Sequence, residues 1–178
     1  MAETLPEHER DDTAIAAALA RKVEGVFERI ERERMRDIPI LNPELKVATT
    51  GMRSFGDVWV TVLVTPWSIN AMLFPNGAQC ADSWTGLPIG TKVQHSLPAG
   101  VFEFICGGED GLGPYRMCSL FSPVLQFENQ EAALAAANAA LGALFDENLG
   151  DPPAEVEAPQ VSRRNLIFGR NSASEERA

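Results

Sequence analysis

The first pattern along the chain is a helical repeat of apolar residues. Between residues 15 and 30 these residues recur at steps of three and four, which predicts an amphipathic helix with one buried stripe. Asp11, Asp12 and Thr13 precede the stripe and can cap the helix, and Pro39 and Pro43 end it. The stripe consists of Ile15, Leu19, Val23, Val26, Phe27 and Ile30.

From residue 57 to residue 74 the pattern changes to a period of two, which predicts two β-strands. Turn residues interrupt the alternation at 65–68, so we expect the strands to form a hairpin. If Thr65 faces Ser68, all the aliphatic pairs lie on one face, and a slip of one residue would exchange the two faces. These pairs are Val64 with Ile69, Val62 with Ala71 and Val60 with Leu73.

The opposite face of the hairpin mixes aromatic, thioether, amide and hydroxyl groups. Such a surface can re-pack around varied apolar partners, which makes it a candidate peptide-binding surface. The alternative is that other parts of the chain cover this face. With a turn residue and a solitary tryptophan included, the candidate residues are Trp59, Leu63, Trp67, Met72, Phe74 and Trp84.

Residues 75–91 are rich in proline and glycine and predict a long irregular segment, in which Trp84 can also serve as a lid over one end of the core. Residues 101–106 predict another strand, followed by a glycine-rich loop at 107–111. Asn129 can cap a second helix that ends at Phe145, and its alanines allow close approach to a sheet.

This order of elements predicts the α+β class: an antiparallel β-sheet with helices packed on one face, as a two-layer sandwich. We expect one domain, residues 1–150. After Asp151-Pro152-Pro153, the composition of residues 151–178 is typical of a flexible C-terminal tail.

Composition and charge narrow the possible partners. The chain has 178 residues, of which 45% are hydrophobic and 22% charged, and its net charge is -10. That charge disfavours nucleic acids and stable association with anionic membranes. Because the N-terminus lacks the basic start and apolar run of a secretion signal, we expect a cytoplasmic protein.

The residues that could carry chemistry are few. A cysteine nucleophile needs a nearby base, and the only pair worth considering is Cys106 with His95. The three cysteines lack a Cys-x-x-Cys pair, although they and His95 could converge on a metal ion. We therefore expect a non-enzyme with no metal site and no cofactor.

The tail contains the most specific motif in the chain, Ser162-Arg163-Arg164-Asn165-Leu166-Ile167, followed by Phe168. It matches the core of a twin-arginine export signal, but its apolar stretch is too short for export. Residues 38–150 hold four basic and ten acidic residues, so they are suited to bind a segment with two arginines followed by apolar side chains. A chance basic patch is the alternative.

Four ordered blocks of the chain carry a family resemblance: DIPILNP at 37–43, LVTPWSINAML at 63–73, PAGVFEF at 98–104 and MCSLFSP at 117–123. Together they resemble the HybE-like family of [NiFe]-hydrogenase assembly chaperones, over most of residues 14–146. The resemblance implies a cytoplasmic, non-enzymatic accessory protein with an α+β two-layer fold. It also implies binding to the hydrogenase small-subunit precursor and its twin-arginine signal peptide, which delays export until the enzyme is assembled.

Three hypotheses of function follow. In the first, the mixed face of the hairpin receives the apolar part of the signal and nearby carboxylates receive its arginines. In the second, the chain is a scaffold that recruits the hydrogenase large subunit or an electron-carrier partner. In the third, the tail residues Ser162, Arg163, Arg164, Leu166, Ile167 and Phe168 are an internal mimic of the client, tethered at roughly millimolar concentration.

Overall fold

A tightly paired hairpin lies at the centre of the fold. It joins β3 (Val58–Val64) to β4 (Ile69–Pro75), and its register pairs Val64 with Ile69 and Val60 with Leu73, as the alternation predicts. The turn is held by Thr65, whose Oγ1 donates to the Ser68 carbonyl oxygen at 2.8 Å and accepts from the Ser68 amide at 3.0 Å. These bonds fix the register and therefore which residues share a face.

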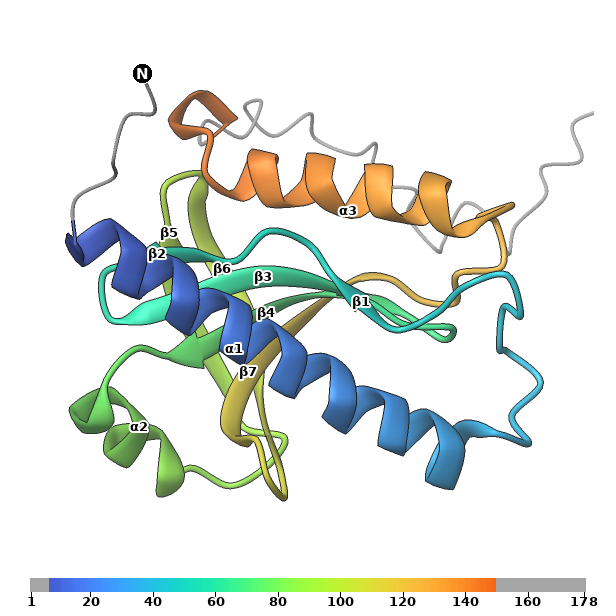
Figure 1. The fold of residues 1–178 in the computed structure, drawn as a ribbon, viewed down its shortest axis with the longest axis horizontal. Helices are drawn as coiled ribbons and strands as arrows, with labels where there is room; N and C mark the ends of the chain where they lie inside the picture. Colours follow the sequence, from blue (N-terminus) through green and yellow to red (C-terminus); the bar gives the residue numbers. More distant parts are fainter. Residues whose placement is uncertain (1–6, 150–178) are drawn as a thin grey trace, which may run out of the picture.

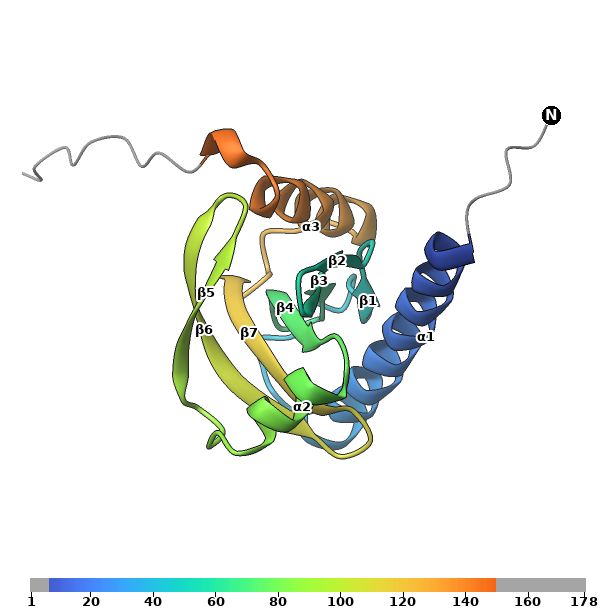
Figure 2. The same cartoon turned by 90° about the vertical axis from the view of Figure 1, so that its left-hand side faces the viewer.

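The computed structural model describes residues 7–149, with side chains from residue 12 onward. The hairpin belongs to a seven-stranded antiparallel sheet with the order β1-β3-β4-β7-β6-β5, in which β2 also pairs with β3 (Figures 1 and 2). The other strands are β1 (Ala48–Thr49), β2 (Arg53–Phe55), β5 (Lys92–Leu97), β6 (Gly100–Glu109) and β7 (Gly113–Phe121).

Helices cover both faces of the central hairpin. The first helix, α1 (Glu7–Ile30), continues as a π-helical turn, Glu31–Met35, and packs on the mixed face, whereas α3 (Gln130–Leu144) packs on the aliphatic face. Figure 2 shows the two helices on different sides of the sheet. The α+β class and the antiparallel sheet are confirmed, but the helices do not share one face, because every residue of β3 is buried and each face needs its own cover.

The predicted second helix is confirmed together with its cap. The side-chain oxygen of Asn129 accepts a hydrogen bond from the Ala132 amide at 2.9 Å. Ala133 and Ala137 are fully buried against the sheet, so small side chains bring the helix close to the strands. The helix is followed by a short 3-10 turn, Glu147–Leu149.

Three segments differ from the sequence prediction. Helix α1 begins at Glu7, before the expected cap at residues 11–13. The segment at 75–91, expected to be irregular, contains α2 (Ala78–Thr85), whose Cys80 and Trp84 are buried. Burial of these two side chains by long-range packing stabilises the short helix. The surrounding prolines and glycines favour an irregular segment, so the sequence pattern did not predict this helix.

The third difference is at residues 107–109, which continue β6 instead of forming a loop. An added Cβ at Gly107 would lie only 2.6 Å from Cζ of Tyr115, so the ring of Tyr115 occupies the space that any side chain at 107 would need. The glycine is therefore required for close packing within a strand.

The boundary near residue 150, the expected flexible tail and the motif at 162–168 lie outside the described residues. These features remain predictions.

The covering of the mixed face by α1 can be tested with Phe27→Ala. Phe27 is 5% exposed and its ring centroid lies 6.0 Å from that of Tyr115. We expect a loss of about 3–5 kcal/mol in the free energy of unfolding, because the cavity opens between helix and sheet. Urea denaturation followed by circular dichroism measures it. Ile15 was predicted to lie in the buried stripe of this helix but is 51% exposed, so it serves as the control. Equal losses for Ile15→Ala and Phe27→Ala would contradict this packing.

The role of Gly107 can be tested with Gly107→Ala. We expect destabilisation of about 1–3 kcal/mol, because the methyl group must displace the Tyr115 ring. Gly142, inside α3 with nothing within 4 Å of an added Cβ, is the control. Its replacement by alanine should instead stabilise the protein by up to about 1 kcal/mol. Thermal unfolding that shifts in the same direction for both variants would be inconsistent with the crowding at Gly107.

Candidate functional site

The mixed face of the β3–β4 hairpin is closed to solvent. Trp59, Leu63, Met72 and Phe74 are 4%, 0%, 0% and 2% exposed, and they pack beneath α1. The prediction that these residues form an open peptide-binding surface is therefore corrected, because the apolar stripe of α1 needs the same area for its own burial. The alternative, that another part of the chain covers this face, describes the structure.

The remaining two candidates, Trp67 and Trp84, lie on different sides of the sheet and do not form one surface together. Trp67 is half-buried in the turn between β3 and β4 and packs against the cluster under α1. Trp84 lies on the other side of the sheet, where it is 6% exposed, and the Arg116 guanidinium sits 3.9 Å from the centre of its ring. Trp84 is thus a buried member of the core cluster on the α3 side of the sheet.

A different apolar surface is open. A groove of about 590 Å³ lies between the C-terminal half of α3 and the turn that joins β5 to β6. Val101 and Leu149, both on its walls, are 65% and 57% exposed. The complete lining is Ala99, Gly100, Val101, Phe102, Leu120, Ala140, Ala143, Leu144 and Leu149.

Local geometry holds the two walls of this groove in place. The Ala99 amide donates a 3.2 Å hydrogen bond to the carbonyl oxygen of Leu144, which ties the β5–β6 turn to the last turn of α3. Gly100 follows with a φ of +137°, a conformation that side chains rarely adopt, and thereby starts β6 beside the helix. The groove exists because small residues line its helix wall and the turn.

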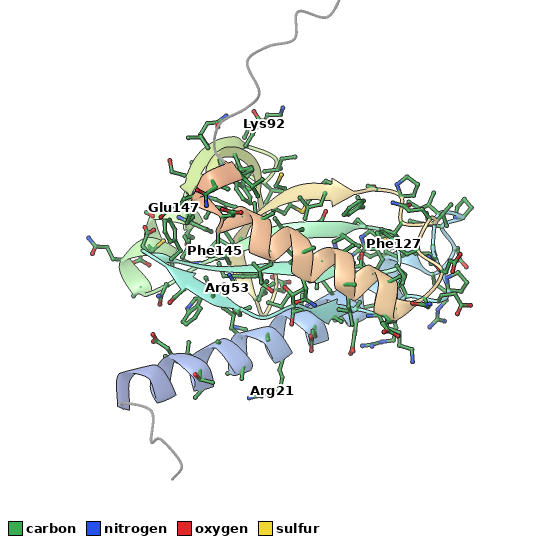
Figure 3. All side chains as sticks on the ribbon, turned by 90° about the horizontal axis from the view of Figure 1, so that it is seen from above. Arg21, Arg53, Lys92, Phe127, Phe145 and Glu147 are labelled. Carbon is green, nitrogen blue, oxygen red and sulfur yellow. The ribbon has the colours of Figure 1, made fainter. Side chains whose placement is uncertain are left out.

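Two acidic residues follow the helix wall of the groove in the chain. Asp146 and Glu147 lie in the chain between Leu144 and Leu149, at the C-terminal end of α3, where the helix dipole also favours a cation. Figure 3 shows Phe145 and Glu147 at this end of the helix, opposite Phe127. The Arg53 guanidinium also lies at this end, 5.1 Å from the centre of the Phe145 ring. Asp146 accepts hydrogen bonds from Asn148, whereas Glu147 has no partner among the described residues.

A second, smaller cleft of about 320 Å³ lies near the β6–β7 turn, between Trp84 and Glu109. Of its two acidic lining residues, Glu109 pairs with Arg34, and Arg116 also lines the cleft. Arg29 donates to the backbone oxygen of Asp110 at 2.7 Å, so two cations from α1 and its extension hold this turn. Such a cleft is less suited to accept a further cationic segment.

The residues tested for chemistry are kept apart. His95 pairs with Phe102 across β5 and β6, and Cys106 lies four residues further along β6, about 13 Å away along a strand. Burial raises the pKa of the Cys80 and Cys118 thiols, which keeps them protonated and weakly nucleophilic, and burial also lowers the pKa of His95. Within residues 12–149, no three His, Cys, Asp or Glu side chains are grouped to hold a metal ion.

Sequence reasoning missed the groove because its walls come from residues about forty positions apart. The only local signal was the alanine-rich face of α3, which we interpreted as a surface for helix-to-sheet contact. Ala133 and Ala137 do make that contact, whereas Ala140 and Ala143 line the open groove. Among residues 7–149, no helix combines the length and apolar character required to cross a bilayer.

Comparisons with known proteins agree with this fold. The chain is 34% identical over 159 residues to the hydrogenase expression/formation protein HupJ of Bradyrhizobium diazoefficiens, covering 88% of this chain and 90% of that protein. It is 35% identical to protein HoxT of Cupriavidus necator, covering 84% and 88%. The solution structure of HybE from Escherichia coli superposes with a TM-score of 0.59 at 29% identity, over 87% of this chain and 91% of that one.

A family model described as [NiFe]-hydrogenase assembly, chaperone, HybE matches residues 18–169, most of the chain. The chain therefore belongs to the HybE family of [NiFe]-hydrogenase assembly chaperones.

Proposed function

We propose that this assembly chaperone works in the cytoplasm and binds the hydrogenase small-subunit precursor through its twin-arginine signal peptide. Occupation of the signal would delay export until assembly is complete. We propose that it acts by binding, as its membership of a family of assembly chaperones suggests.

The observation that carries this proposal is the apolar groove with an acidic end. A twin-arginine signal presents two guanidinium groups followed by apolar side chains. The groove walls suit the apolar part, and Glu147 with the C-terminal end of α3 suits the arginines. A volume of about 590 Å³ lies in the range of about 300–1,000 Å³ that is usual for ligand sites, so it accommodates a few side chains.

The groove also explains how one surface could accept different clients. Its helix wall is formed by Ala140 and Ala143, which impose little shape of their own. Binding is then decided by apolar contact and charge and does not depend on a fitted pocket for one side chain. The mixed face under α1 has no such role, because its residues stabilise the fold.

Blocking the groove should weaken this binding. Ala143 is an exposed residue on the groove wall, and in Ala143→Trp the indole fills the space. We expect the dissociation constant for a labelled small-subunit signal peptide to rise about tenfold or more, which corresponds to about 1.4 kcal/mol or more. Fluorescence anisotropy with the full chain measures it. Ala135→Trp, at an exposed position of the same helix outside the groove, should bind like the parent.

Equal affinity in these two variants would contradict the groove as the site. If neither the parent chain nor variants with substitutions at residues 163–168 bind any signal peptide, signal recognition itself is contradicted. Capture of a small subunit without its signal, or of the large subunit alone, would favour the scaffold alternative.

Glu147 should contribute a smaller, salt-dependent part of the affinity for the signal peptide. Glu147→Gln removes a carboxylate beside the groove, and we expect the dissociation constant to rise about two- to fivefold at low salt, as is usual for an exposed ion pair. The difference should shrink as salt screens the charges. Glu131→Gln, which makes the same change at the N-terminal end of α3, is the matched control. An equal effect from both variants would show that only net charge matters.

A further inference from the structure

We propose that residues 163–168 of this chain occupy the groove beside α3 when no client is bound, so that the chaperone carries its own weak competitor. This inference rests on the proposed function of the groove and concerns its regulation. The occupant is a segment of the same chain that lies outside the described residues.

The chemistry of the segment matches the groove. Arg163 and Arg164 are followed, after one residue, by Leu166, Ile167 and Phe168. Between residues 158 and 174 the chain has three arginines and no acidic residue, although the whole chain has a net charge of -10. A local cationic and apolar stretch of this kind complements an apolar groove with Glu147 at its end.

The connection between the two is short. Leu149 is the last described residue and itself lines the groove. Thirteen residues, 150–162, separate it from Arg163 and can span at most about 45 Å. The connecting chain therefore starts at the groove and is long enough for residues 163–168 to return to it. A tether of this length gives an effective concentration of about 1 mM.

The extent of the family match supports a role for the segment. The described residues end at Leu149, but the match to the HybE family model continues to Gly169, one residue after Phe168. The motif thus falls within the sequence that the family model describes, and the last nine residues of the chain lie beyond it.

A tethered segment has a defined consequence for the client. Because its local concentration is fixed, even weak contact raises the apparent dissociation constant of the client. The client, which presents the same chemistry on a longer apolar stretch, still displaces it at higher affinity. Short or incomplete signals, which bind the groove more weakly, would then fail to displace the tail.

The test uses two readouts on the full chain. The first is the dissociation constant of a synthetic twin-arginine signal peptide of a hydrogenase small subunit. The double variant R163Q/R164Q should bind it about threefold or more tightly than the parent, since the competitor is weakened. The matched control, R170Q/R177Q, removes the same charge outside the motif and should leave the dissociation constant unchanged.

The second readout needs no client. In NMR spectra, the amide signals of Val101, Ala143 and Leu149 should shift between the parent and L166S/I167S/F168S, whereas V156S should leave them in place. The shifts should not depend on protein concentration. Shifts that grow with concentration would assign the occupant to the tail of a second copy and overturn the intramolecular proposal.

The two readouts separate the two proposals. If the parent binds the signal peptide and no tail variant alters either readout, self-occupation is overturned and the proposed function stands. If the groove amides respond to the tail variants but no form of the chain binds the signal peptide, the tail docks as proposed and signal recognition fails.

Discussion

The constraint on which this structure depends is the burial of both faces of the β3–β4 hairpin. Every residue of β3 is buried, so the hairpin is stable only if a helix covers each side. The stripe of α1 covers the face of Trp59, Met72 and Phe74, and the alanine face of α3 covers the other. The buried residues of α1, from Val23 to Ile30, and those of α3 are therefore committed to the fold, and a binding surface has to be found where this cover ends.

The groove lies at such a place. Near its C-terminal end, α3 passes from the buried Ala137 to Ala140 and Ala143, and the sheet continues beyond it into β6 and β5. The hydrogen bond between Ala99 and Leu144 keeps the two walls together while the space between them stays open. A helix with small side chains packs closely on the centre of the sheet and leaves an apolar recess at the edge of the contact. Larger side chains on the helix would fill this recess.

Features set by neighbouring residues were predictable from the sequence, and features set by distant contacts were not. The register of the hairpin follows from alternation and from the Thr65 side chain, and the start of α3 follows from Asn129. The sequence did not predict that α1 covers the mixed face. A hydrophobic stripe can pack against either face of the sheet, because the hydrophobic effect has no directional preference. The tail motif, a local pattern, was visible at once, whereas the groove joins residues of α3 to residues of β6 and β7 and was not.

The need to bury the mixed face explains why the proposed site differs from the one that the sequence suggested. An acidic protein that receives arginines and apolar side chains needs an apolar recess and a carboxylate near it, and either face of the sheet could have supplied them. The mixed face was excluded by its need for burial, since α1 would lose its own cover if a client displaced it. At the groove, Val101 and Leu149 are already exposed, so a client can bind there without unfolding any element of the chaperone. Reversible binding by an assembly chaperone requires this separation between the contacts that hold the fold and the contacts that hold the client.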